Sequence, residues 1–322
     1  MPAVPRPEFR ELLHRCADAQ RVLLVAHQKP DGDTLGSSSA VLNWLCREKK
    51  DVTAFCKDPV PQAFRHLDRA YRYTTDPTVF SGMYDLVIVF DSGDLRYCGV
   101  DTFFPQLRPG YFLVNLDHHA TNTRFADLNI VMTTASSTAE VVYRFLEACS
   151  VEIDRLMATS LLNGLLTDTS HFTNGATTVK ALEAAGSLVA LGARMDHITQ
   201  AVMRNKATPA LRLWGLMLSR LHLDAAHGIA TTYLRHADAD GVPSEAIEGL
   251  SNFLSATLAD ADAMLTLRET PDGLIKGSLR SASRDISRLA QALGGGGHKK
   301  AAGFAIPGRI EETPGGPRII PV

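Results

Sequence analysis

Residues 22–37 decide the fold of this chain, and they read Val-Leu-Leu-Val-Ala-His-Gln-Lys-Pro-Asp-Gly-Asp-Thr-Leu-Gly-Ser. The apolar run 22–25 predicts a buried strand. Residues 37–48 predict a helix with one apolar face. Between the two, Pro30 and Gly32 favour a tight turn at the carboxyl end of the strand. The stretch therefore predicts a strand, a polar turn and a helix in immediate succession.

One imidazole and two carboxylates lie in or beside this turn. His27, Asp31 and Asp33 are close enough in sequence to converge at the end of the strand. Together they offer the nitrogen and oxygen ligands of a divalent cation. Because Pro-Asp-Gly-Asp is also common turn chemistry, this motif by itself leaves a plain solvated turn open.

The same arrangement recurs further along the chain. The apolar runs 51–56, 85–90 and 111–116 predict further strands, and residues 154–166 predict a helix. Acidic or imidazole side chains follow three of these segments: Asp91, Asp117, His118, His119 and Asp168. Continuous apolar strands separated by helical stretches predict an α/β fold with a parallel sheet and helices on both faces. Functional groups in such sheets gather at the carboxyl ends of the strands, so we expect these side chains to meet there.

Bulk composition limits the classes of function. Of the 322 residues, 45% are hydrophobic and 21% are charged, which is typical of a globular protein. The formal net charge of −2 argues against a salt-driven grip on long nucleic acid. The five cysteines include no pair with CxxC spacing, so we expect reduced thiols and a cytoplasmic protein. No apolar run is long enough to span a bilayer, and we expect no membrane partner.

Two domains are expected from the length and the strand pattern. Residues 1–194 are expected to form a metal-binding domain, 195–221 a helical connector, and 222–322 a smaller α/β domain. A glycine-rich segment, followed by His298, lies in the second domain. The chain after Phe304 is rich in proline and glycine, which predicts a frayed tail.

The number of acidic and imidazole clusters predicts two divalent cations. Aspartate and histidine in this proportion suit manganese, or a comparable ion, better than calcium or a thiolate-bound zinc. Two cations roughly 3.5–4 Å apart need a bridging carboxylate, and they can activate a water for attack on phosphorus. A neighbouring histidine can protonate the leaving oxygen. Any one of these residues, taken singly, is more readily explained as a cap, turn or core residue.

Six motifs in order resemble those of a DHH-family phosphoesterase with a C-terminal DHHA1-type domain. They are His27-Gln28-Lys29-Pro30-Asp31-Gly32-Asp33, Val89-Phe90-Asp91-Ser92, Leu116-Asp117-His118-His119, Thr167-Asp168-Thr169, Gly277-Ser278-Leu279-Arg280-Ser281 and Gly294-Gly295-Gly296-Gly297-His298. The resemblance covers nearly the whole chain. It implies that the active site lies in the cleft between the two domains.

The resemblance also implies a role for each residue of the motifs. His27 and Asp31 would hold one metal ion, and Asp33, His118 and Asp168 the other, with Asp91 bridging the two. Asp117 would orient its neighbours. His119 would act in catalysis as a proton donor or phosphate contact. In the second domain, the residues expected to bind substrate are Ser278, Arg280, Gly295, Gly296, Gly297 and His298.

Relatives of this length resemble oligoribonucleases that degrade nanoRNA to nucleoside 5′-monophosphates, many of which also remove the 3′-phosphate of adenosine 3′,5′-bisphosphate (pAp). Hydrolysis of cyclic di-AMP or of the dinucleotide pApA is the alternative. A non-catalytic nucleotide sensor is an alternative of another class, and would predict lost ligands. A RecJ-like exonuclease would need further domains, and a family II pyrophosphatase carries a different second domain. The partners expected are short oligoribonucleotides or small nucleotides, with a homodimer by analogy.

Overall fold

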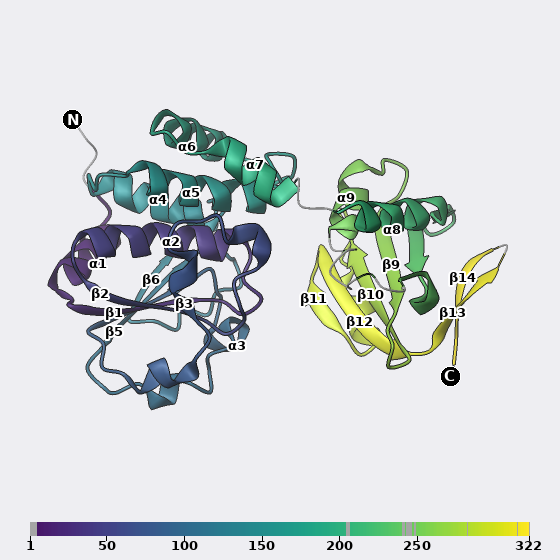
Figure 1. Ribbon diagram of the computed structural model, residues 1–322, viewed down its shortest axis with the longest axis horizontal. Coiled ribbons are helices and arrows are strands. Elements are labelled where there is room, and N and C mark those ends of the chain that lie inside the picture. Colours follow the sequence, from purple (N-terminus) through teal and green to yellow (C-terminus); the bar gives the residue numbers. More distant parts are fainter. Residues whose placement is uncertain are drawn as a thin grey trace. The chain divides into compact units, whose positions relative to one another are not determined.

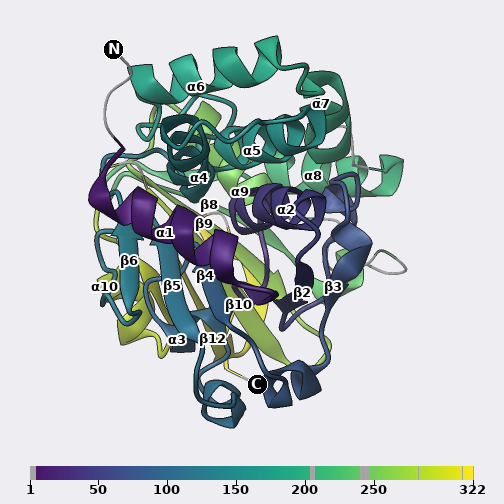
Figure 2. The same ribbon diagram turned by 90° about the vertical axis from the view of Figure 1, so that its left-hand side faces the viewer.

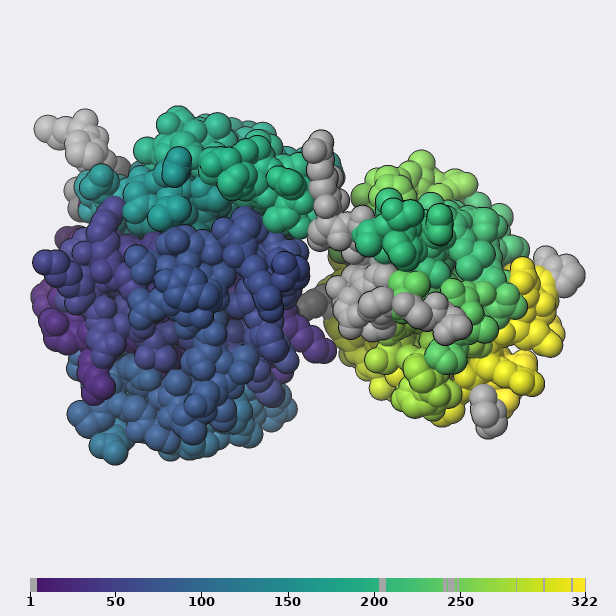
Figure 3. Space-filling model, in the orientation of Figure 1, coloured from purple at the N-terminus to yellow at the C-terminus, as the bar shows by residue number. Residues whose placement is uncertain are grey.

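A computed structural model describes residues 5–203, 207–239, 242, 247, 249–281, 283–313 and 315–321, without the side chains of Met203 and His298. The chain forms two compact units, Met1–Asn205 and Lys206–Val322 (Figure 1). The residues of each unit form one continuous surface, purple to teal in the first and green to yellow in the second (Figure 3). The range expected as a connector is divided between them, because helices α7 (Met195–Met203) and α8 (Thr208–Ser219) belong to different units.

The first unit is built on a sheet of six parallel strands in the order β3-β2-β1-β4-β5-β6. The strands are β1 Arg21–Ala26, β2 Asp51–Cys56, β3 Tyr73–Thr74, β4 Leu86–Phe90, β5 Phe112–Asp117 and β6 Leu128–Val131. The apolar run of the opening stretch is β1, which lies at the middle of the sheet with all but its first residue buried. The short strands β3 and β6 were not expected from the sequence.

Helices cover one face of this sheet in layers (Figures 1 and 2). They are α1 Pro7–Asp18, α2 Gly32–Arg47, α4 Thr138–Ala148, α5 Arg155–Asp168 and α6 Val179–Ala190. Helices α2 and α4 contact the strands. Helix α5 packs on α2 and α4, and α6 packs on α5. One core contains Val22, Leu24 and side chains of these helices.

The opposite face of the sheet is covered differently from the expectation of helices on both faces. Its core includes Leu23, Val25 and Phe55, and the covering side chains include Phe80 and Phe104 from short 3₁₀ turns. The four-residue helix α3, Leu95–Cys98, contributes Cys98. Aromatic side chains from short turns therefore provide the apolar area that long helices provide on the other face.

The second unit has a mixed six-stranded sheet in the order β11-β12-β10-β9-β8-β7. Its strands are β7 His222–Asp224, β8 Ile229–Leu234, β9 Ala263–Glu269, β10 Leu274–Arg280, β11 Gly296–His298 and β12 Ala301–Pro307. Helices α8 and α9 (Leu250–Thr257) share a core with Met264, and the segment carrying α10 (Ser287–Ala292) shares a second core with Leu267. Successive side chains of a strand point to opposite faces, so Met264 and Leu267 of β9 lie on opposite faces of the sheet. Helices α8 and α9 therefore cover one face, and the segment carrying α10 covers the other.

The expectation of a frayed tail is wrong. Strands β13 (Arg309–Thr313) and β14 (Gly316–Ile320) pair as an antiparallel hairpin. Ile310 is buried in the core of the unit, and its backbone N–H donates to Glu269. The end of the chain therefore forms an ordered hairpin rather than a frayed tail.

All five cysteines are free, as expected. Within the described part of the chain, no helix has the length and apolar character that crossing a membrane requires.

The close contact of α2 with α5 depends on glycine at position 36. A Cβ atom at Gly36 would lie 2.4 Å from the carbonyl oxygen of Ser160, whereas one at Gly186 on α6 would meet nothing within 4 Å. We expect Gly36→Ala to lower the free energy of unfolding by about 1–3 kcal/mol through overpacking. Gly186→Ala, the matched control, should raise it by about 0.5–1 kcal/mol through helix propensity. Urea unfolding measures both, and equal effects would contradict this account of the contact.

Candidate metal centre

The predicted ligands of the first unit meet at one edge of its sheet. His27 follows β1, Asp91 follows β4, and His118 follows β5. Asp31 caps the first turn of α2, in which Asp33 lies, and Asp168 is the last residue of α5. The carboxyl ends of three neighbouring parallel strands and two helix ends thus place these side chains together.

Three side chains form a first group of ligand atoms. His27 Nε2 lies 3.6 Å from Asp31 Oδ1 and 3.5 Å from Asp91 Oδ2. His27 Nδ1 contacts its neighbour's carbonyl oxygen at 2.7 Å. That contact assigns a proton to Nδ1, so Nε2 is the ring nitrogen that faces the two carboxylates and would bind a metal ion.

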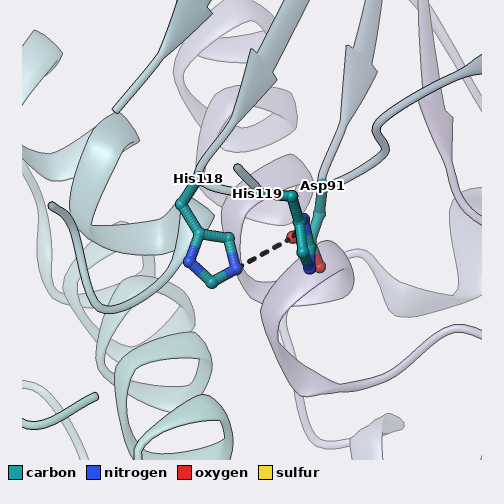
Figure 4. Close-up of side chains that lie close together, drawn as sticks. All are labelled: Asp91, His118 and His119. Carbon is teal, nitrogen blue, oxygen red and sulfur yellow. Dashed lines mark ion pairs between the residues drawn. The ribbon is translucent and has the colours of Figure 1, made fainter. Parts of the chain in front are cut away.

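A second group lies on the other side of Asp91. His118 Nε2 lies 3.5 Å from Asp168 Oδ2 and 3.6 Å from Asp91 Oδ1, the contact drawn in Figure 4. Asp33, His118 and Asp168 offer ligand atoms that all lie within 4.8 Å of one another. The two oxygens of Asp91 therefore face different histidines, which is the geometry of a carboxylate able to bridge two ions.

Asp91 is held in this position by both its backbone and its neighbours. Its φ angle is +56°, in the left-handed region that non-glycine residues rarely adopt. Its backbone N–H donates to the carbonyl oxygen of Leu116 at 2.9 Å, and the hydroxyl of Thr138 donates to Oδ1 at 2.8 Å. Strain of this kind persists where the surrounding structure determines the conformation, and it clusters at functional sites.

The start of α4 holds the carboxylate of Asp33. The backbone N–H of Thr138 donates to Asp33 Oδ2 at 2.7 Å, and that of Ala139 donates to Oδ1 at 2.8 Å. These are two of the N–H groups that an α-helix leaves unpaired at its start. The positive end of the helix also favours the ionised form of the carboxylate.

Asp117 makes contacts that fit an orienting role. Its Oδ1 accepts from the backbone N–H of His118 at 2.8 Å and lies 2.7 Å from Nδ1 of His119. Its Oδ2 accepts from Asn122 Nδ2 at 2.6 Å. His119 Nδ1 also lies 3.7 Å from Asp91 Oδ1, so this ring stands beside the ligand groups (Figure 4).

The acids are crowded enough to repel one another. Burial, with the charges of Asp91 and Asp168, raises the pKa of Asp33 well above its usual value. Burial and the same charge of Asp91 raise the pKa of Asp168 to about 8. Buried carboxyl groups that raise one another's pKa are typical of functional sites, and a divalent cation among them removes the repulsion.

The histidines respond to the same charges. Burial alone would lower the pKa of His27, but Asp31 and Asp91 raise it to about 12. Burial likewise opposes protonation of His119, whose pKa the carboxylate of Asp117 raises to about 9. For His118, burial is the largest effect and lowers the pKa. The donor set of carboxylate oxygens and imidazole nitrogens, without thiolates, fits a hard or borderline divalent ion.

Two of the substrate residues predicted in the second unit, Ser278 and Arg280, lie on the same face of β10. Arg280 and Ser278 line a pocket of about 260 Å³. Arg280 Nε donates to Asn252 Oδ1 at 2.8 Å. The glycine run forms strand β11, and Gly296 and Ser278 both pair with Gly303 of β12. The side chain of His298 lies outside the described residues.

Two residues that hold predicted members of the site, one a ligand and one the orienting Asp117, were not assigned to the site from the sequence. Neither Thr138 nor Asn122 was singled out as a functional residue from the sequence. The amide of Asn122 donates to Asn115 Oδ1 at 2.7 Å as well as to Asp117. The one sequence signal is that Asn122 closely follows the Asp117-His118-His119 motif.

Comparisons with known proteins agree with this geometry. Residues 21–166 match the DHH family, N-terminal domain, and residues 228–313 match the DHHA1 domain. The chain is 28% identical over 311 residues to the bifunctional oligoribonuclease and PAP phosphatase NrnA of Thermus thermophilus, covering 94% of this chain and 91% of that protein. It is 27% identical over 308 residues to the cyclic-di-AMP phosphodiesterase GdpP of Geobacillus thermodenitrificans, covering 90% of this chain but 45% of that protein.

A solved structure shows the same fold. The exopolyphosphatase-related protein from Bacteroides fragilis has a TM-score of 0.86 to this chain at 22% identity, covering 94% of this chain and 92% of that one.

The matching domains and relatives define a hydrolase that acts on phosphoester bonds. The chain belongs to the DHH family of phosphoesterases, with a DHHA1 domain in its second unit. Phosphoesterases of this family are metal-dependent, which agrees with the groups of aspartate and histidine ligands. The resemblance stated from the motifs is therefore confirmed, as is the α/β fold class.

The hydroxyl of Thr138 should contribute to metal affinity through Asp91. Thr138→Val keeps the shape of the side chain and the N–H that binds Asp33, but removes the donor to Asp91. We expect metal affinity to fall roughly 10- to 100-fold. Thr138→Ser, which keeps the hydroxyl, is the matched control. Calorimetric titration of the metal-free protein with Mn²⁺ measures the change, and unaltered affinity in the valine variant would contradict this role.

Proposed function

We propose that the first unit holds two divalent cations, manganese being the ion that the donor set favours. His27 and Asp31 bind one ion, Asp33, His118 and Asp168 bind the other, and Asp91 bridges them. The observation that carries this proposal is that Oδ2 of Asp91 lies 3.5 Å from the ring of His27 while Oδ1 lies 3.6 Å from that of His118.

When bound, such a pair of ions activates a water molecule and stabilises the charge that develops on the phosphoryl group. The protein supplies the remaining groups. Asp117 Oδ1 lies 2.7 Å from Nδ1 of His119, and this carboxylate favours the protonated form of the ring. His119 is thus suited to donate a proton from Nε2 to the leaving oxygen or to bind a phosphate oxygen.

The substrate we propose is a short oligoribonucleotide, hydrolysed to nucleoside 5′-monophosphates, with pAp as a second substrate. Support comes from the relative in Thermus thermophilus, a bifunctional oligoribonuclease and PAP phosphatase that matches over nearly its whole length. Arg280 provides a planar guanidinium suited to a substrate phosphate, and it lines a pocket together with Ser278. Residues 296–298 pair with β12, the strand next to that of Arg280. The net charge of −2 suits a small anion better than a long strand.

Hydrolysis of cyclic di-AMP or pApA is the second candidate. It is favoured by the similarity to the cyclic-di-AMP phosphodiesterase of Geobacillus thermodenitrificans, but the match spans less than half of that protein. A nucleotide sensor without activity is a weaker candidate, since the described residues retain every predicted metal ligand.

The proposal predicts a metal-dependent activity that Asp91 controls. Purified protein with Mn²⁺ should convert a five-nucleotide RNA to nucleoside 5′-monophosphates, and EDTA should abolish the activity reversibly. Asp91→Asn should lower kcat/KM at least about 1000-fold, equivalent to roughly 4 kcal/mol, because the bridging carboxylate is lost. Chromatography of the products, with pAp, pApA and cyclic di-AMP as parallel substrates, measures the rates.

Asp101→Asn is the matched control. Asp101 is exposed, and its substitution removes the same charge without changing a predicted ligand. Full activity in Asp91→Asn would refute the two-ion arrangement. Faster hydrolysis of cyclic di-AMP than of RNA would favour the second candidate, and tight nucleotide binding without turnover would favour the sensor.

A further inference from the structure

Three cationic side chains share one face of strands β9 and β10. Every second side chain of a strand projects to the same side of the sheet. On β10, one side therefore carries Lys276, Ser278 and Arg280. Opposite them in register lie Met264, Thr266 and Arg268 of β9. Lys276 and Arg268 are therefore direct cross-strand neighbours, one step along the face from Ser278.

This face opens into two adjoining pockets. The pocket of about 260 Å³ that contains Arg280 and Ser278 is also lined by Ile247, Arg268 and Lys276. The same three residues line a second pocket of about 340 Å³. Lys276 and Arg268 thus stand where the two pockets join.

The second pocket has an apolar wall and a charged mouth. The apolar side chains come from α8, β8 and the segments beside them: Leu213, Leu234, Ala239, Val242, Ile247 and Pro271. An apolar cavity with a few charged groups at its mouth is the usual form of a small-molecule site.

Among the described residues that line this pocket, the acids are Glu269 and Asp272. Glu269 accepts from the backbone N–H groups of His236 and Ile310. Asp272 is exposed, and a hydrogen bond from Thr270, with a smaller effect of Lys276, lowers its pKa.

The second pocket lies away from the glycine run. In the order β11-β12-β10-β9-β8, the glycine run is on β11, and Arg280 lies on β10. Lys276 and Arg268 continue across β10 and β9 toward Leu234 of β8. A nucleotide bound between Arg280 and the glycines would therefore leave this pocket open to the next nucleotide of the chain.

We propose that Arg268 and Lys276 bind the phosphate of an additional nucleotide and that the apolar pocket beside them receives its base. The inference rests on the proposed function and extends it: the second unit distinguishes substrates by length, with tighter binding of oligoribonucleotides that reach this subsite than of pAp, which does not.

Lys276→Gln in the full-length protein tests the subsite, because it removes one charge from an exposed side chain. We expect KM for 5′-phosphorylated oligoadenylates of three and four residues to rise roughly 5- to 10-fold, as for the loss of one charge-assisted hydrogen bond. The kcat for these substrates, and both constants for pAp, should stay as in the wild type. Arg318→Gln removes the same charge from the exposed hairpin and is the matched control.

Ala239→Phe provides a second variant, since it fills the apolar pocket without removing a charge. It should weaken binding of a fluorescent tetra-adenylate to protein kept in EDTA, measured by anisotropy, and leave binding of pAp unchanged. Equal effects of Lys276→Gln on pAp and on the tetranucleotide, or no effect of either variant at any length, would overturn the subsite. If the wild type binds oligoadenylates but hydrolyses none, the proposed function fails while the subsite stands.

Discussion

The crowding of buried carboxylates at the carboxyl edge of a parallel sheet is the constraint on which the site depends. Asp33 and Asp91 are almost completely buried, and Asp168 joins them from another helix. Buried charges are costly unless they are paired and hydrogen-bonded. The chain meets this requirement with the amides at the start of α4, the hydroxyl of Thr138 and the rings of His27 and His118, and bound divalent cations would complete the compensation.

The sheet provides the precision that such a site requires. β1 lies between β2 and β4, and Val25 pairs with Phe55 on one side and Val89 on the other. Apolar side chains pack against both faces of this strand. A close-packed core tolerates little displacement. The distances between the predicted metal-binding side chains that follow β1, β4 and β5 are therefore nearly fixed.

Much of this arrangement follows from local sequence patterns, and the remainder depends on contacts between distant segments. Apolar runs ending at His27, Asp91 and His118 indicate parallel strands, since parallel strands place their carboxyl ends at one edge. Thr138 is 47 residues from Asp91, its hydrogen-bond partner, so no local pattern marks it. The hairpin at 309–320 was missed because proline and glycine mark turns as well as loose ends. The phenylalanines that cover one face of the sheet lie on turns too short to show a helical period.

Asp168 connects the site to a helix outside the layer that packs on the sheet, which the other predicted ligands do not. It is carried by α5, which packs on α2 and α4 rather than on the strands. Within that contact, a Cβ atom at Gly164 of α5 would lie only 2.8 Å from Oδ1 of Asp33. An ion shared by Asp33 and Asp168 would therefore cross-link the two helical layers, so that release of the ion and loosening of α5 become linked equilibria. Through this linkage, substitutions far from any nucleotide would change how long a bound cation is retained.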